Sequence, residues 1–203
     1  MAVSPRKGRT FPVEPLTSAE VAALLRQCST TAPTGIRNRA LITVMYRCGL
    51  RVSEALDLRA SEVNPANGTV HVLRGKGGKA RVVGLDDGGM ALLQRWMDKR
   101  AQLGYKHGPL FCTLRGTPVS GVYVRNMMKR LGRKAGIEKR VHPHGLRHSH
   151  AVEMAAEGIA MNVIQKQLGH HRLSTTDTYL NHIAPADVIA MGRARKPWNP
   201  EEL

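Results

Sequence analysis

Apolar residues recur at three- and four-residue intervals along most of the chain, which is the spacing of one face of an α-helix. Thr17 and Glu20 stand where a capping box would begin the first helix, and Gly49 stands where the second would end. The spacing predicts helices over residues 16–28, 36–48, 51–58, 90–103, 121–136, 145–158, 161–168 and 184–194.

Two short runs break the helical pattern. Residues 69–73 and 80–85 are rich in β-branched side chains, and the sequence RGKGGK separates them, so together they predict a β-hairpin. Residues 1–16 contain three prolines and three basic residues without periodicity, which is typical of a linker or tail. The predicted fold is mainly α with a small antiparallel β-sheet, an α+β fold.

The chain is strongly basic. Its 203 residues, 42% of them hydrophobic, suffice for one domain or two small ones. Lys and Arg number 31 against 15 Asp and Glu, a net charge of +16. This excess predicts a polyanionic partner, with nucleic acid as the first candidate. An anionic membrane surface is the alternative, but the sequence has neither a lipidation motif nor a basic amphipathic helix of the membrane-binding kind.

Cysteine usage and hydropathy bear on where the protein works. Cys28, Cys48 and Cys112 are scattered, odd in number and without a CxxC spacing, which disfavours a disulfide framework and favours a reducing cytosol. No apolar run approaches the roughly 18 residues of a membrane span, and the N-terminus lacks the apolar stretch of a signal peptide. We expect a soluble cytoplasmic protein, associated with the nucleoid.

The glycine-rich turn of the predicted hairpin has two interpretations. GKGGKA matches the dinucleotide pattern G-x-G-x-x-G/A in letters, but that pattern requires a helix after it, and here a strand follows. One interpretation is a surface turn with solvated lysines. The other is an arm that enters a DNA groove, carrying Arg74, Lys76, Lys79 and Arg81.

Four histidines fall within the nine residues HPHGLRHSH, which suggests a metal site. Zinc sites usually show a cleaner spacing and a carboxylate or cysteine partner, so we expect no metal. In a helix beginning near His144, Arg147 and His148 would share one face with it. An imidazole beside a guanidinium is suited to holding a phosphodiester.

Glu54 and Tyr179 each have a structural interpretation and a functional one. Glu54 lies one helical turn after Arg51, so the two form either a surface ion pair or an arrangement that orients Arg51 toward a phosphate. Tyr179, nine residues after His170, is either a half-buried tyrosine or a nucleophile. A free phenol has a pKa near 10, so a nucleophilic role requires nearby positive donors.

Taken in order, these motifs resemble those of the tyrosine recombinase (phage integrase) family. GLRVSEAL resembles the family's first arginine motif, RGKGGKARVV its β-hairpin lysine motif, and HPHGLRHSHA its H-x-x-R motif. LGHHRLSTTDTYLNH is similar to its last motif, which places a histidine nine residues before the tyrosine. The resemblance covers residues 17–185 and implies the tyrosine recombinase catalytic-domain fold, as in Xer-like members or the short fimbrial-switch invertases.

The resemblance implies a reaction and its nucleophile. In the family, a tyrosine attacks a DNA phosphodiester to give a 3′-phosphotyrosyl bond and a free 5′-hydroxyl, without ATP, metal or cofactor. By resemblance, Tyr179 is this nucleophile. Arg51 and Arg147 would stabilise the charge of the transition state, with a further hydrogen bond from His170.

The resemblance also implies the proton transfers. Lys76 would protonate the leaving 5′-oxygen, and His144 would act as general base or proton relay for Tyr179. Glu54 would orient Arg51. Other cations are expected to bind double-stranded DNA through phosphates and bases: Arg74, Lys79 and Arg81 of the hairpin, and Arg125, Lys129, Arg130, Arg133 and Lys134 of the helix over 121–136.

The resemblance divides the chain into a basic linker or tail (1–16), a catalytic domain (17–185) and a C-terminal exchange segment or tail (186–203). Most family members carry a core-binding domain before the catalytic one, so the chain is either a natural one-domain member or a catalytic fragment. In the family the C-terminal segment packs on a neighbouring subunit, so we expect a tetramer on two DNA sites. DNA-bending accessory proteins are further candidate partners.

Several functions are compatible with these features. Site-specific recombination, in integration, excision or inversion, agrees with all of them. A type IB topoisomerase shares the tyrosine chemistry, and a non-catalytic DNA-binding protein could keep the fold. The complete series of catalytic residue types favours an enzyme that breaks and rejoins DNA.

Overall fold

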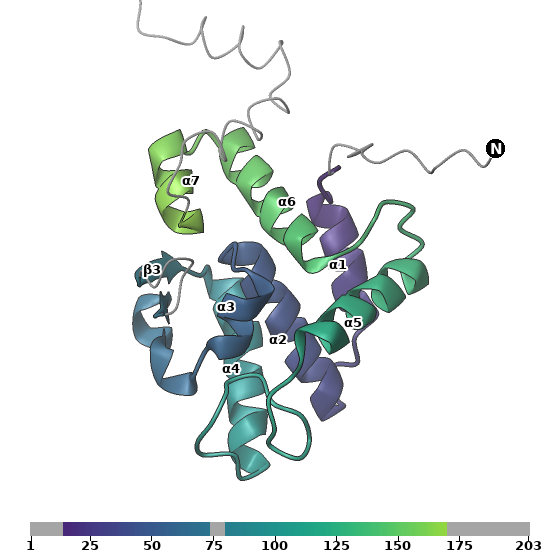
Figure 1. The fold of residues 1–203 in the computed structure, drawn as a ribbon, viewed down its shortest axis with the longest axis vertical. Helices are drawn as coiled ribbons and strands as arrows, with labels where there is room; N and C mark the ends of the chain where they lie inside the picture. Colours follow the sequence, from purple (N-terminus) through teal and green to yellow (C-terminus); the bar gives the residue numbers. More distant parts are fainter. Residues whose placement is uncertain (1–13, 74–79, 170–203) are drawn as a thin grey trace, which may run out of the picture.

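The computed structural model describes residues 14–73 and 80–169, and these form a helical body with one small sheet (Figure 1). Within this part of the chain the helices are α1 (Ser18–Arg26), α2 (Pro33–Arg47), α3 (Val52–Asp57), α4 (Asp87–Gln102), α5 (Gly121–Lys134), α6 (Pro143–Ala156) and α7 (Met161–Leu168). Short 3-10 turns at Ala60–Glu62 and Pro65–Asn67 flank the first strand.

The sheet is antiparallel, with the order β1 (Val63–Asn64), β2 (Thr69–Val72) and β3 (Arg81–Gly84). Val70 pairs with Val83, and both side chains are buried, whereas the paired His71 and Val82 are exposed. One face of the sheet therefore joins the core, as the alternation of a half-buried strand requires.

Helix α2 runs through the middle of the molecule and contacts α3, α4 and α6 (Figure 1). It is buried on nearly all sides, which is typical of a central helix. Even Arg37 is buried; its Nη1 donates to the carbonyl of Cys112 over 3.0 Å and its Nη2 to the hydroxyl of Tyr123 over 2.8 Å. These bonds satisfy the buried guanidinium and tie α2 to α5.

Helix α7 packs on a small apolar cluster of its own beside the main core. Ile164 and Leu168 of α7 are buried against Ala151 of α6, and α7 also contacts β3. Since this cluster is small, polar contacts to the end of α7 carry much of its attachment, and two arginines described below supply them.

The predicted elements agree closely with the structure. The capping box of Thr17 and Glu20, the helix end at Gly49 and the hairpin are confirmed. Strand β1 was not predicted, since two residues are too few to show alternation. Helix α4 begins three residues before the predicted start, at an N-cap formed by Asp86, because Gly88 and Gly89 hide the helical pattern there. Among the described residues, the first buried one is Leu16, the last residue of the predicted tail.

The predicted helix over 184–194 lies outside the described residues. Within the described ranges, no helix is both long and apolar enough to cross a bilayer.

Candidate active site

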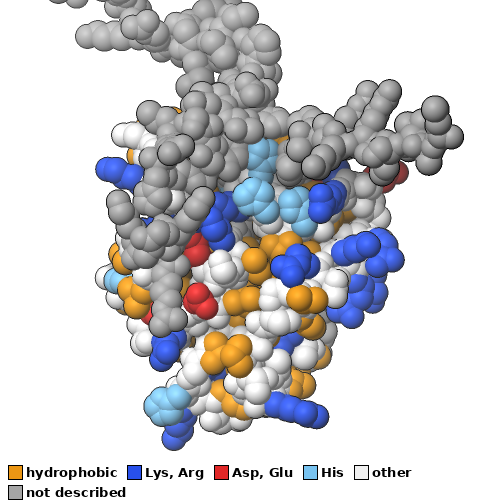
Figure 2. Space-filling view, in the orientation of Figure 1, with side chains coloured by type: hydrophobic (Ala, Val, Ile, Leu, Met, Phe, Trp, Pro, Cys, Tyr) orange, Lys and Arg blue, Asp and Glu red, His pale blue; other side chains and the backbone are white. Residues whose placement is uncertain are grey.

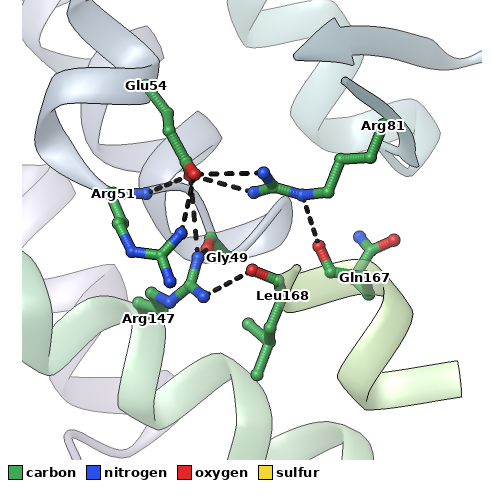
Figure 3. A network of polar contacts seen from close by, with 7 residues as sticks. All are labelled: Gly49, Arg51, Glu54, Arg81, Arg147, Gln167 and Leu168. Atoms are coloured by element: carbon green, nitrogen blue, oxygen red, sulfur yellow. Dashed lines mark hydrogen bonds and ion pairs between the residues drawn. The ribbon is translucent and has the colours of Figure 1, made fainter. Parts of the chain in front are cut away.

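Glu54 is the centre of a group of charged side chains that come from distant parts of the chain (Figure 3). It lies in the first turn of α3, and its side chain is 2% exposed. The Arg51 amide donates to Glu54 Oε2 over 2.8 Å, and Arg51 Nη1 donates to Oε1 over 2.8 Å. Glu54 thus caps α3 and holds the Arg51 side chain. The alternative of an ordinary surface pair is wrong, because the carboxylate is buried.

Arg81, the first residue of β3, binds the same carboxylate with two parallel hydrogen bonds. Its Nη1 donates to Glu54 Oε1 over 3.0 Å and its Nη2 to Oε2 over 2.9 Å, while its Nε donates to the carbonyl of Gln167 over 3.0 Å. The side chain is 11% exposed. The structure departs here from the prediction that Arg81 contacts DNA, because its donors are directed into the protein.

Arg147 of α6 completes the group from the opposite side. Its Nη1 lies 3.7 Å from Glu54 Oε2 and donates to the carbonyl of Gly49 over 2.6 Å, and its Nη2 donates to the carbonyl of Leu168. Its side chain is 1% exposed. We call Arg51, Glu54, Arg81 and Arg147 the Glu54 cluster. It joins α3, β3 and α6, and two of its arginines, Arg81 and Arg147, cap the C-terminal end of α7, where cations are favoured.

The electrostatics of the cluster favour an ionised Glu54. Burial alone would raise the pKa of this carboxyl. Hydrogen bonds from Arg81 and from the Arg51 amide, with the charges of Arg81 and Arg147, outweigh burial and lower the pKa of Glu54 to about 2. The carboxylate is therefore charged at neutral pH.

His144 lies near the arginines but reaches the surface. Its side chain is exposed, in the first turn of α6, and its ring stacks on that of His142 with the centroids 6.4 Å apart. Desolvation, followed by the charges of Arg147 and Arg51, lowers the pKa of His144 below its usual value. The imidazole is thus mostly neutral at pH 7 and able to accept a proton.

His150, by contrast, is built into the helix junction. It is 4% exposed, and neither ring nitrogen has a hydrogen-bond partner among the residues that the structure describes. A Cβ placed on Gly49 would lie 2.6 Å from its ring and 2.7 Å from the Leu168 side chain, so Gly49 allows α2, α6 and α7 to meet closely. Gly49 also has φ +62°, a conformation that other residues rarely adopt. His150 therefore has a packing role, while His148 is likewise buried, at 5% exposure.

The predicted cations of α5 lie on two faces of that helix. Arg125, Lys129 and Arg133, spaced four residues apart, line a hollow of about 480 Å³ together with Asn126, Arg140 and His142. Arg130 and Lys134 lie one residue further on, about 100° around the helix, and do not line this hollow. All five are exposed, and Figure 2 shows Lys and Arg side chains gathered over this part of the molecule. His142 joins the hollow to the start of α6.

Several predicted site residues lie outside the described ranges, namely Arg74, Lys76, Lys79, His170 and Tyr179. Their positions in the chain are nevertheless informative. Residues 73–80 connect β2 to β3, so Lys76 precedes Arg81 by five positions, and His170 follows directly on Gly169, the C-cap of α7. Among the residues that the structure describes, no three His, Cys, Asp or Glu side chains are placed to hold a metal ion.

Sequence reasoning missed the contacts that the fold supplies to these side chains. The carbonyls of Gly49, Gln167 and Leu168 hold arginines, and a carbonyl has no signature in the sequence. Asn126 is different, because helical spacing of three and seven residues alone puts it on one face with Lys129 and Arg133.

Comparison with known proteins identifies the family. Residues 14–185 match the description "Phage integrase family", a range that takes in the Glu54 cluster and α5. The chain belongs to the phage integrase family.

Individual relatives agree with this family. The tyrosine recombinase XerD of Pseudomonas putida is 37% identical over 185 residues, which is 90% of this chain and 61% of that protein. The tyrosine recombinase XerC of Yersinia pestis is 34% identical over 197 residues, 95% of this chain and 64% of that protein. The chain thus spans about three fifths of the length of these curated relatives.

Solved structures give the same fold. The XerA recombinase superposes with a TM-score of 0.78 at 28% identity, covering 97% of this chain and 68% of that one. XerH, in a post-cleavage complex with its palindromic difH substrate, gives 0.74 at 28% identity, covering 89% and 52%. The catalytic domain of bacteriophage HP1 integrase gives 0.63 at 23% identity, covering 93% and 98%, which supports the fold alone. The fold is that of a tyrosine recombinase catalytic domain.

Proposed function

We propose that this chain acts as the catalytic part of a site-specific DNA recombinase, with residues 17–185 as the catalytic domain. It cuts and rejoins double-stranded DNA through a 3′-phosphotyrosyl intermediate. Membership of the phage integrase family supports the reaction class. The observation that carries the proposal is the meeting of Arg51 and Arg147, which lie far apart in the sequence, at the Glu54 carboxylate.

The reaction proceeds by exchange of one phosphodiester for another. The Tyr179 oxygen attacks phosphorus, and the bond from phosphorus to the 5′-oxygen breaks. The phenolic proton passes to His144, whose lowered pKa favours the neutral base, and Lys76 supplies the proton for the 5′-oxygen. A free 5′-hydroxyl later attacks the phosphotyrosine and restores the diester, so no cofactor is consumed.

The arginines stabilise the charge that builds up on the non-bridging phosphate oxygens. Arg51 is the member of the pair that reaches solvent, with 27% of its side chain exposed. Arg147 is 1% exposed, so in this proposal its buried charge acts on the phosphate from beside Arg51. His170 provides a further hydrogen bond in this proposal.

The DNA path is proposed to run from the hollow beside α5 to Arg51. Arg125, Lys129 and Arg133 line that hollow, and His142 lies between it and His144. Arg74 and Lys79 would contact DNA from the segment between β2 and β3. We place Arg130 and Lys134 outside the main DNA contact, because they lie on another face of α5.

Assembly is proposed from the family resemblance. Residues 186–203 would pack on a neighbouring subunit, giving a tetramer on two DNA sites, and DNA-bending proteins would assist. Residues 1–16 would serve as a linker. Its last residue is anchored to the domain, since the Leu16 amide donates to Ser149 Oγ over 2.7 Å and the side chain is buried.

A selection for covalent adducts tests the proposal without knowledge of the target. Nicked duplexes with randomised arms are incubated with the protein, and DNA that stays bound in denaturing detergent is sequenced. A nick just 3′ of the cleavage point lets the short fragment that carries the free 5′-hydroxyl dissociate, which traps the adduct. We expect one recurrent sequence from the wild type and no adduct from Tyr179→Phe.

The outcomes separate the candidate functions. Adducts that persist in Tyr179→Phe would contradict the assigned nucleophile. Absence of any adduct, together with tight binding to a particular sequence, would contradict the proposal and favour a DNA-binding protein of the same fold.

A further inference from the structure

We propose that Arg81 is a positioning residue that occupies the Glu54 carboxylate and thereby leaves the positive charge of Arg51 and Arg147 available to a phosphate. The proposal rests on the function proposed above and concerns how its site is set up. Its basis is the geometry of the Glu54 cluster, in which one carboxylate is shared among three guanidinium groups (Figure 3).

The bonds to Glu54 are distributed unequally. Arg81 spans the carboxylate with one donor on each oxygen, at 3.0 and 2.9 Å, which is the strong bidentate arrangement. Arg51 uses one guanidinium nitrogen on Oε1, at 2.8 Å. Arg147 lies farther from the carboxylate, with its Nη1 3.7 Å from Oε2. The negative charge of Glu54 is therefore matched mainly by Arg81, which bonds both carboxylate oxygens.

The consequence is a cluster with surplus positive charge. Three guanidinium groups against one carboxylate leave a net charge of +2, with Arg51 and Arg147 on the side away from Arg81 (Figure 3). Without Arg81 the same carboxylate would be shared by the other two arginines alone. It would then compete with a phosphate for their donors, because an N–H group that is bonded to the carboxylate is not available to the phosphate.

Arg81 also fixes the surroundings of the site. Its Nε holds the carbonyl of Gln167, in the last turn of α7, over 3.0 Å. A Cβ on Gly169 would lie 3.2 Å from the Arg81 side chain, so the end of α7 packs directly on it. One side chain thus ties β3, α3 and the end of α7 together. The segments that carry Lys76 and His170 adjoin β3 and α7 in the sequence.

The test compares variants on the nicked duplex recovered from the selection above. We expect Arg81→Met to slow adduct formation at saturating DNA by about 10- to 100-fold, because fewer preorganised donors face the phosphate. Dissociation constants for the DNA should stay within about threefold. Arg81→Lys keeps the charge but not the bidentate bond, so it should slow adduct formation less than Arg81→Met does. Arg26→Met removes an exposed arginine of α1, a helix that supplies no residue of the cluster, and serves as the matched control.

A second substitution separates the effect of the Glu54 charge on the rate from the effect of losing the packing contacts of Arg81. In the Arg81→Met background, Glu54→Gln removes the negative charge that competes for Arg51 and Arg147 and should restore at least about threefold of the lost rate, although it slows the wild type. If the double variant is as slow as Arg81→Met or slower, the charge argument is overturned. The same holds if Arg81→Lys is as slow as Arg81→Met. Thermal unfolding of each variant verifies that it is folded.

Inorganic phosphate gives a readout that does not depend on cleavage. Binding is followed by the phosphorus NMR shift of the anion. Weaker binding by Arg81→Met, with recovery on adding Glu54→Gln, supports the inference even if the wild type forms no adduct, in which case the proposed function alone fails. Unchanged binding by Arg81→Met, or no phosphate binding by the wild type, overturns the inference.

Discussion

The Glu54 cluster and the exposed face of α5 are both rich in arginine, yet their surroundings differ completely. Arg81 and Arg147 have 11% and 1% of their side chains exposed, and backbone carbonyls and one carboxylate hold them. Arg125, Lys129 and Arg133 are exposed and line an open hollow. A cation fixed by the protein is suited to stabilising a transition state, whereas a solvated one contributes affinity that salt weakens. Residue type alone does not distinguish the two.

The largest effect should come from Arg147→Lys. A lysine cannot reach the carbonyls of Gly49 and Leu168 and a phosphate with a fixed planar group, so the donor geometry is lost. We expect single-turnover adduct formation to fall by about 100-fold or more, with DNA affinity within about threefold. An equal fall in affinity and rate would mean that the cluster binds DNA rather than assisting the chemistry.

The α5 face should show the opposite behaviour. Lys129→Gln with Arg133→Gln removes one lysine and one arginine from the hollow, and should reduce the slope of log K against log salt by about 1.8. Arg130→Gln with Lys134→Gln removes the same two residue types, equally spaced, from the neighbouring face. This matched pair should leave the slope nearly unchanged. Equal reductions of the slope in the two double variants would show that the salt dependence follows net charge alone.

Substitution of two glycines in the left-handed conformation compares the packing at the Glu54 cluster with the packing after α5. Gly49→Ala places a Cβ 2.6 Å from the His150 ring, whereas a Cβ on Gly136, after α5, meets nothing within 4 Å. We expect Gly136→Ala to cost about 1 kcal/mol for the backbone alone. Gly49→Ala should cost about 1–3 kcal/mol more, because overpacking adds to the backbone cost. Urea unfolding measures both, and similar costs would contradict close packing at the cluster.

His150 gives the smallest predicted effect, a dependence of stability on pH. Desolvation, with the charges of Arg47 and Arg147, lowers the pKa of His150 to about 4 in the folded protein. Protons therefore bind the unfolded chain first, so stability is full above about pH 6.5 and falls as the pH drops toward 4.

We expect the loss from this residue to reach about 2 kcal/mol at pH 5. The measurement is urea unfolding at pH 7 and pH 5, for the wild type and His150→Phe. The variant should lose less stability between the two pH values. An identical loss in both proteins would show that His150 does not titrate in this way.

The sequence predicted those features that depend on neighbouring positions. Helical spacing, the capping box at Thr17 and the glycine at position 49 are local, and the structure confirms each. The two faces of α5 were also within reach, since Lys129 and Arg130 differ by a fixed rotation. The count of cations alone does not separate the two faces, because it takes no account of the direction in which each side chain points.

The position of Arg81 could not be predicted in this way. Its partners, Glu54 and Gln167, are separated from it by 27 and 86 positions, and their meeting depends on how β3, α3 and α7 pack. In the sequence, Arg81 follows Arg74, Lys76 and Lys79 and resembles one more cation of a basic hairpin. Burial and two hydrogen bonds to one carboxylate distinguish it, and only the folded chain provides them.

The most direct test of these separate roles, chemistry at the buried cluster and affinity at the exposed face of α5, is the rate of adduct formation as a function of DNA concentration. It is measured in wild type, Arg147→Lys and the Lys129→Gln, Arg133→Gln variant. We predict that Arg147→Lys has a low plateau and a normal half-saturation point. The α5 variant should reach the wild-type plateau at higher DNA concentration. A lowered plateau in the α5 variant, or a normal plateau in Arg147→Lys, would contradict the assignment of chemistry to the buried cluster and affinity to the exposed face.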